Sequence, residues 1–302
     1  MLSNDKHKAE QHSHTKLARF DFYYDRIKQG LTLLALVATG IICLSFIVTL
    51  LYFHHLTQAQ SKISDHQLRT DLLHFPGDDG LNRNVSDVTS EYDDSLNSLV
   101  VGPRSVNNHV VDALLASEDT SFYHHKGVLP KALFRAMFQD IFNAPVSSGG
   151  STITQQLVKN QVLSNEKTYS RKANEIVLAM RTEHVLSKKE ILYTYLNIVP
   201  FGRDFKGNNI SGIAPASYSL FGKSPNELNV AESAYLIGLL QSPYTYTPYH
   251  EDGTLKTKAR LQVGIDRQHY VLRRMRVENK ISEKDYEQAK HYDIAQHLQT
   301  AK

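Results

Sequence analysis

Several residues that would mark particular protein classes are scarce or absent. There is one cysteine, Cys43, and no tryptophan, so a disulfide framework is excluded. The 15 histidines form no H-E-x-x-H or other metal-ligand spacing, so we predict no zinc site. The segment before Gly222 and Lys223 lacks the first glycine of the phosphate-binding pattern G-x-x-x-x-G-K-[ST], because Ser217 stands there. Nucleotide hydrolysis is therefore not indicated.

Charged residues are also missing from Leu31 to Phe53, a run of 23 residues. As a helix, this run is long enough to span a hydrocarbon core of about 30 Å. We predict a retained transmembrane anchor, because the apolar run and its leader are too long for a cleaved signal peptide. Six basic residues precede the run, and only Lys62 and Arg69 follow it closely. The N-terminus is therefore expected to be cytoplasmic, and the chain from His54 onward extracytoplasmic, at the cell membrane.

The rest of the chain divides by charge. Residues 54–100 carry eight acidic and three basic residues, a balance of −5. They are predicted to form an acidic stalk, either a flexible spacer or a partner-docking segment. Residues 101–302 carry 25 Lys and Arg against 19 Asp and Glu, a balance of +6, which favours an anionic lipid or substrate. No nucleic-acid-binding motif is present. We expect a tail at 1–30, an anchor at 31–53, a stalk at 54–100 and one mostly helical domain at 101–302.

The apolar pattern of this domain is helical, and strand alternation is hard to find. Two capping boxes are predicted, Ser224 with Glu227 and Ser282 with Asp285. One helix, Leu129–Asn143, has aromatic residues over half its circumference, which fits either core burial or an interfacial helix at a membrane. The other predicted helices cover Val106–Asp119, Ser151–Leu163, Ser170–Leu186, Ser187–Val199, Ser224–Gln241 and Ile281–Lys290.

The first candidate for chemistry is "ASEDTSFYHHKG", where an apolar helix ends in the adjacent acids Glu118 and Asp119. A carboxylate that emerges from an apolar helix is partly desolvated and suits general-base catalysis. The plain alternative is a helix C-terminus with two solvated acids.

The second candidate is "RKANE", in which Arg171, Lys172 and Glu175 share one helix surface. An exposed ion pair is the plain interpretation. Two cations fixed by a carboxylate also suit a phosphate or pyrophosphate. The preceding segment "GGSTITQQLVKN" would add a helix N-terminus to such a site, together with a polar helix face that carries Thr152, Gln155, Gln156 and Lys159. The plain interpretation of this face is a solvated helix surface.

Taken in order, these segments resemble motifs of the peptidoglycan glycosyltransferase family, glycosyltransferase family 51. This family occurs as monofunctional enzymes and as the first catalytic domain of class A penicillin-binding proteins. "ILYTYLNIVPFG" and "AYLIGLLQSPYTYTP" resemble its two later motifs, and coverage runs from Val106 to Ile294. The resemblance implies a mainly α, lysozyme-like domain with a larger lobe and a smaller membrane-associated lobe. The aromatic helix Leu129–Asn143 would belong to the smaller lobe.

The resemblance also implies a reaction. Lipid II would be polymerised into glycan strands with inversion at MurNAc C1 and release of undecaprenyl pyrophosphate. Glu118 would be the general base for the acceptor 4-hydroxyl, and Glu175 would assist the pyrophosphate directly or through a divalent cation, Mg²⁺ or Mn²⁺, with no other cofactor. The implied substrate-binding residues are Asp119, Phe122, His125, Gly150, Ser151, Thr152, Gln155, Gln156, Lys159, Asn160, Arg171 and Lys172.

Two departures from the family pattern limit these expectations. "GRDFKGNNISGIAPASYSLFGK", which is polar and altered, stands where the family has a glycine-rich turn, so we assign no catalytic role to Arg203 or Lys206. No transpeptidase motif precedes the end at Lys302, so we expect a monofunctional enzyme with a transpeptidase partner, or a truncated longer protein. The alternative functions are a lysozyme-like glycan hydrolase and a non-catalytic scaffold for cell-wall synthesis. The basic pair Arg171 and Lys172 favours the polymerase, because a hydrolase needs no group to hold a pyrophosphate, and the membrane anchor would place the site beside a lipid-linked donor.

Overall fold

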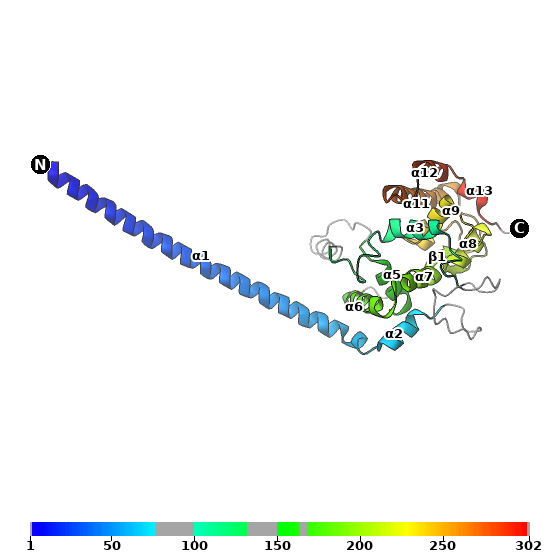
Figure 1. The fold of residues 1–302 in the computed structure, drawn as a ribbon, viewed down its shortest axis with the longest axis horizontal. Helices are drawn as coiled ribbons and strands as arrows, with labels where there is room; N and C mark the ends of the chain where they lie inside the picture. Colours follow the sequence, from blue (N-terminus) through cyan, green and yellow to red (C-terminus); the bar gives the residue numbers. More distant parts are fainter. Residues whose placement is uncertain (1, 76–99, 132–149, 164–167, 301–302) are drawn as a thin grey trace. The chain divides into compact units, whose positions relative to one another are not determined.

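Figure 1 shows the computed structural model of the chain, which describes residues 2–75, 100–131, 150–163 and 168–300. It divides into two compact units, Met1–Gln58 and Ala59–Lys302. The fold is mainly helical, as the sequence predicts. Most of the predicted aromatic helix Leu129–Asn143 lies outside the described residues, so that helix and the smaller lobe stay predictions.

The first unit consists of most of one long helix, α1 (Leu2–Ser61). Its segment Tyr23–Gln58 contains an 18-residue window with a mean hydropathy of 2.6, so the segment is long and apolar enough to cross a membrane, by length and composition. The hydroxyls of Thr32, Thr39 and Thr49 each donate to the backbone carbonyl four residues earlier, at 2.8 Å. The apolar segment thus satisfies these polar groups within the helix, as a bilayer requires.

The helix α2 (Asp65–Leu72) belongs to the second unit. Leu68 and Leu72 of this helix, and Phe75 just after it, are buried in the hydrophobic core of the second unit. Arg69 donates to the Val185 carbonyl at 2.7 Å and to Glu190 Oε1 at 2.6 Å. The part of the predicted stalk from Asp65 to Phe75 is therefore packed against the domain and is not a free spacer, while residues 76–99 lie outside the described part of the chain.

Four helices carry the predicted site: α3 (Asn108–Glu118), α5 (Ile153–Gln161), α6 (Tyr169–Val185) and α7 (Lys188–Ile198). Asn107 caps α3 by accepting a hydrogen bond from the His109 N–H at 3.0 Å. Thr168 caps α6 by accepting from the Arg171 N–H at 3.0 Å. Both are N-cap positions, where short polar side chains satisfy helix N–H groups that lack a backbone partner.

A β-hairpin that the sequence pattern did not predict lies between Pro200 and Ser211. The strands β1 (Pro200–Arg203) and β2 (Asn209–Ser211) pair antiparallel, with an irregularity between Pro200 and Gly202. Asp204 Oδ1 closes the turn by accepting from the backbone N–H groups of Lys206 and Asn208, at 2.9 and 2.8 Å. Strands this short give almost no alternation, which is why the pattern was not visible.

One of the two predicted capping boxes starts no helix. Ser224 N–H does donate to Glu227 Oε2 at 2.9 Å, but these residues form a turn. The helix begins five residues later, where Asn229 and Glu232 form another capping box. The box of Ser282 with Asp285 is confirmed. The helices of this half are α8 (Ile213–Phe221), α9 (Val230–Leu239), α10 (Pro243–Tyr246), α11 (Lys258–Val277), α12 (Glu283–Lys290) and α13 (Ile294–His297).

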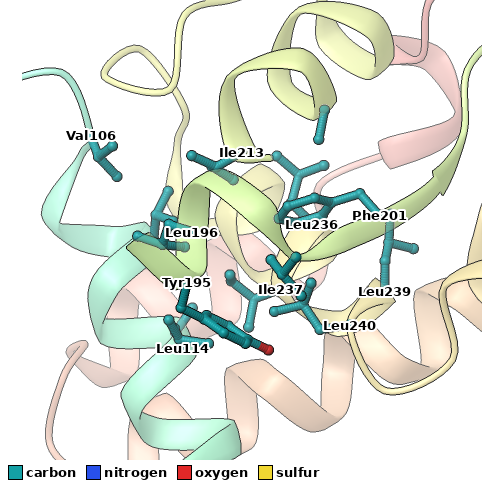
Figure 2. Close-up of a cluster of buried hydrophobic side chains, with 14 of the residues drawn as sticks. Val106, Leu114, Tyr195, Leu196, Phe201, Ile213, Leu236, Ile237, Leu239 and Leu240 are labelled. Carbon is teal, nitrogen blue, oxygen red and sulfur yellow. The ribbon is translucent and has the colours of Figure 1, made fainter. Parts of the chain in front are cut away.

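The helix α9 lies at the centre of the domain. Nearly all its residues are buried, and it packs against α3 and α11. In Figure 1, α3 lies between the group of α9, α11 and α12 and the group of α2, α5, α6 and α7. Figure 2 shows part of the shared core, in which Leu114 of α3, Tyr195 of α7 and Ile237 of α9 belong to one cluster. Leu114 of α3 therefore packs in a core that both groups share.

The docking of α2 can be tested by Leu72→Ala in the full chain. Because Leu72 is 0% exposed, we expect a loss of about 2–5 kcal/mol in the free energy of unfolding, measured by urea denaturation in detergent. The matched control is Val277→Ala, since Val277 is 66% exposed. Equal stability of the two variants would contradict the docking.

Candidate active site

Glu118 is the last residue of α3 and stands at the edge of the core, with its side chain 14% exposed. Its Oε2 accepts a hydrogen bond from Gln156 Nε2 at 3.1 Å. Its Oε1 lies 3.6 Å from Arg267 Nη2. Each carboxylate oxygen therefore faces one donor, and the side chain still reaches solvent, as a proton acceptor for a substrate must.

Asp119 points into the protein instead. Its carboxylate is buried, and Oδ2 accepts from His125 Nε2 at 2.8 Å and from the Ile153 backbone N–H at 3.0 Å. Ile153 is the first residue of α5, so Asp119 ties the end of one helix to the start of another. The interpretation of two solvated acids is wrong for this residue. Its predicted contact with substrate stays a prediction.

The loop after Asp119 is locked by a histidine and a glycine. His125 Nδ1 accepts from the Gly127 N–H at 3.0 Å, so Nε2 is the nitrogen that donates to Asp119. Gly127 has φ +89°, and a Cβ there would lie 2.5 Å from the Ala179 carbonyl oxygen. Only glycine fits this position. Phe122 is 1% exposed, so Phe122 and His125 lie beneath the surface of the site.

Thr152 and Gln155 form a capping box at the start of α5. Thr152 Oγ1 accepts from the Gln155 N–H, and Gln155 Oε1 accepts from the Thr152 N–H, both at 3.1 Å. Thr152 Oγ1 also donates to the Gly127 carbonyl at 2.6 Å. Both residues are buried. Neither a solvated surface nor an open cleft wall describes them, because the loop of Gly127 and the helix α6 cover this turn.

The two adjacent glutamines of α5 reach the two candidate glutamates. Gln155 Nε2 donates to Glu175 Oε1 at 3.2 Å, and Gln156 Nε2 donates to Glu118 Oε2 at 3.1 Å. A single helical turn therefore contacts both predicted centres. Further along, Lys159 and Asn160 are exposed, as is Gly150 before the helix, so these three can meet a ligand.

Glu175 holds both cations of the "RKANE" motif. Arg171 Nη1 donates to Oε2 at 2.9 Å, and Lys172 Nζ pairs with Oε1. Lys172 Nζ also donates to Ser151 Oγ at 3.1 Å. The Glu175 side chain is 3% exposed, whereas that of Lys172 is 38% exposed. The interpretation as an ordinary exposed pair is wrong, because a buried carboxylate presents a cation at the surface.

A divalent cation bound directly by Glu175 does not fit this arrangement. Both Glu175 oxygens already accept from Arg171, Lys172 and Gln155. Within the described ranges, no group of three His, Cys, Asp or Glu side chains is placed to hold a metal ion. Mg²⁺ and Mn²⁺ prefer oxygen ligands, and here the oxygens face cationic donors.

Two residues next to Glu118 were not predicted from the sequence. Arg267, on α11, stacks on the Tyr270 ring with Cζ 4.1 Å from the ring centroid, and its buried Nε has no hydrogen-bond partner among the described residues. Tyr195, on α7, donates its hydroxyl proton to Gln156 Oε1 at 2.8 Å. Tyr195 stands in the quoted motif "ILYTYLNIVPFG", but that motif does not indicate its contact with Gln156. Arg267 stands in none of the quoted motifs and comes from a helix distant in sequence from Glu118.

Comparison with known proteins identifies the family of the chain. Residues 85–276 match the family model described as Transglycosylase. The chain belongs to the transglycosylase family. Among curated relatives, this transglycosylase is 41% identical over 184 residues to penicillin-binding protein 1A of Haemophilus influenzae, covering 61% of this chain and 20% of that protein. It is 30% identical over 251 residues to penicillin-binding protein 1F of Bacillus subtilis, covering 83% of this chain and 33% of that protein.

Among solved structures, the transglycosylase is similar to the crystal structure of penicillin-binding protein 1A from Haemophilus influenzae. The TM-score is 0.37 at 23% identity, covering 67% of this chain and 18% of that chain. The chain spans a fifth to a third of the length of the curated relatives named above. The family expected from the five motifs is confirmed, while the roles of single residues stay predictions.

The support that Asp119 gives to the transglycosylase site can be measured. Asp119→Ala should lower the free energy of unfolding by about 3 kcal/mol, because it leaves His125 and the Ile153 N–H without their buried acceptor. Asp119→Asn should be closer to wild type, since one amide oxygen can accept both bonds. Thermal unfolding checks this, with the exposed Asp266→Ala as control. An Asp119→Ala protein as stable as that control would contradict the assignment.

Proposed function

We propose that this transglycosylase polymerises lipid II into glycan strands, with Glu118 as the general base. The observation that carries the proposal is the setting of Glu118. It is partly exposed, at the C-terminal end of α3, with one oxygen bonded to Gln156 and the other facing Arg267. A catalytic base needs such a fixed direction together with access to its substrate.

The reaction proposed is a displacement at a sugar carbon. Glu118 removes the proton from the 4-hydroxyl of the acceptor GlcNAc. The oxygen bonds to C1 of the donor MurNAc as the bond from C1 to the pyrophosphate oxygen breaks. The configuration at C1 inverts, and undecaprenyl pyrophosphate leaves with the electron pair. Glu118 must be ionised to start each cycle, and the Arg267 guanidinium lies beside its Oε1.

The leaving group would be received by Arg171 and Lys172. Their side chains are held by the buried Glu175, so little side-chain entropy remains to be lost when a pyrophosphate binds. Fixed cations at a developing negative charge are worth about 10² to 10³ in rate. Since the Glu175 oxygens are already engaged, we assign the leaving-group charge to these cations and exposed Lys159, with no step through Mg²⁺ or Mn²⁺.

A membrane anchor fits a lipid-linked substrate. The helix α1 would hold the protein in the cell membrane with its N-terminus cytoplasmic, since six basic residues precede the apolar run. The domain would then work outside, on lipid II, the growing glycan strand and the bilayer lipid around them. A transpeptidase partner would crosslink the product.

The cations Arg171 and Lys172 also distinguish the proposed polymerase from a glycan hydrolase, which has no pyrophosphate to hold.

The decisive experiment supplies purified full-length protein in detergent with labelled lipid II. Wild type should give polymer that muramidase digests, and Glu118→Gln should lower the rate by about 10² to 10⁴, because the amide cannot accept the proton. The control is Glu287→Gln, an exposed glutamate on α12. Cleavage of preformed glycan without polymer would favour the hydrolase, and lipid II binding without turnover in wild type would favour the scaffold.

The role of Arg267 has its own test. Arg267→Ala should reduce kcat/KM at neutral pH by about 10-fold, because Glu118 Oε1 loses the group that it faces. Arg267→Lys, which keeps the charge, should restore part of the activity. Arg273→Ala, on the exposed side of α11, is the control. A wild-type kcat/KM in Arg267→Ala would remove Arg267 from the site.

A further inference from the structure

Tyr195, Gln156 and Glu118 form a chain of hydrogen bonds across three helices. The Tyr195 hydroxyl donates to Gln156 Oε1 at 2.8 Å, and Gln156 Nε2 donates to Glu118 Oε2 at 3.1 Å. The Tyr195 ring is 0% exposed. Figure 2 shows it within the apolar cluster that includes Leu114 and Ile237. The hydroxyl is therefore the polar end of a fully packed side chain.

We infer that Tyr195 is a positioning residue that keeps the NH₂ end of the Gln156 amide turned toward Glu118 throughout the catalytic cycle. The inference rests on the proposed function only in taking Glu118 as the group that gains and loses the proton. Tyr195 itself would touch no substrate, because its side chain is buried. It would act through the amide.

The need for such a residue follows from the chemistry of the amide. The two ends of a glutamine amide are nearly equal in size, but one donates and the other accepts. While Glu118 is ionised, it accepts from the NH₂ end. Once Glu118 has taken the substrate proton, its O–H can donate to the oxygen end instead. A flipped amide would then stabilise the protonated base and delay its return to the ionised form.

The buried hydroxyl opposes that flip. If the amide turned over, the Tyr195 O–H would face an NH₂ group and its proton would lose the Gln156 oxygen as acceptor, which is costly in a buried site. Burial, and then the negative charge of Glu118, hold the pKa of Tyr195 well above its usual range. The hydroxyl therefore stays protonated and remains a donor in both states of the base.

The test uses Tyr195→Phe in the full chain, which removes only the hydroxyl. We expect kcat for lipid II polymerisation to fall about 10-fold, the effect of losing one hydrogen bond from an ordered network, with KM changed less than about 2-fold. In the background of Gln156→Ala, Tyr195→Phe should have no further effect, since the amide through which it acts is gone. The matched control is Tyr249→Phe, another buried ring whose hydroxyl donates to a backbone carbonyl, that of Gln299.

A spectroscopic measurement separates this inference from the proposed function. In protein labelled with ¹⁵N at glutamine side chains, the Gln156 NH₂ signals, identified by their loss in Gln156→Ala, should shift in Tyr195→Phe and stay unchanged in Tyr249→Phe. If wild type makes no polymer but these signals shift, the proposed function fails and the orienting role stands. Unchanged signals in Tyr195→Phe overturn the inference, whatever happens to kcat, because the effect would then come from packing alone.

Discussion

The buried carboxylate of Asp119 is the contact on which the rest of the site depends. Asp119 is the C-cap residue directly after α3. Its carboxylate accepts a hydrogen bond from His125 in the following loop and another from the first backbone N–H of α5. A negative group is favoured at a helix N-terminus, where N–H groups lack partners. The bond between Gln156 and Glu118 joins side chains from these two helices, and it forms only because their ends are held at a fixed spacing.

Much of the helical fold could be predicted from the sequence, because its signals are local. The box of Ser282 with Asp285 starts a helix as expected. The same pattern at Ser224 and Glu227 does not, because Asn229 and Glu232 repeat it five residues later. Local chemistry cannot choose between two such starts. The choice follows from burial of the helix from Val230 onward, which is a tertiary effect.

The sequence could predict which residues belong to the site, but not which of their side chains are buried or which partners they contact. Helical periodicity placed Thr152, Gln155 and Gln156 on one polar face, and it could not reveal which part of that face another segment covers. The loop of Gly127 covers the first turn, so Thr152 and Gln155 are buried, while Gln156 reaches the edge of the site. Arg267 meets Glu118 only through the packing of α11 on α3, and no local pattern encodes that contact.

The adjacent glutamines of α5 explain why this helix carries uncharged polar groups. Neighbouring helical side chains diverge by about 100°, so Gln155 and Gln156 reach different glutamates, Glu175 and Glu118. A lysine at either position would neutralise its glutamate, and a glutamate would repel it. An amide orients the carboxylate without changing the net charge. The Glu175 carboxylate can then pair with Arg171 and Lys172, and the Glu118 carboxylate can accept a proton.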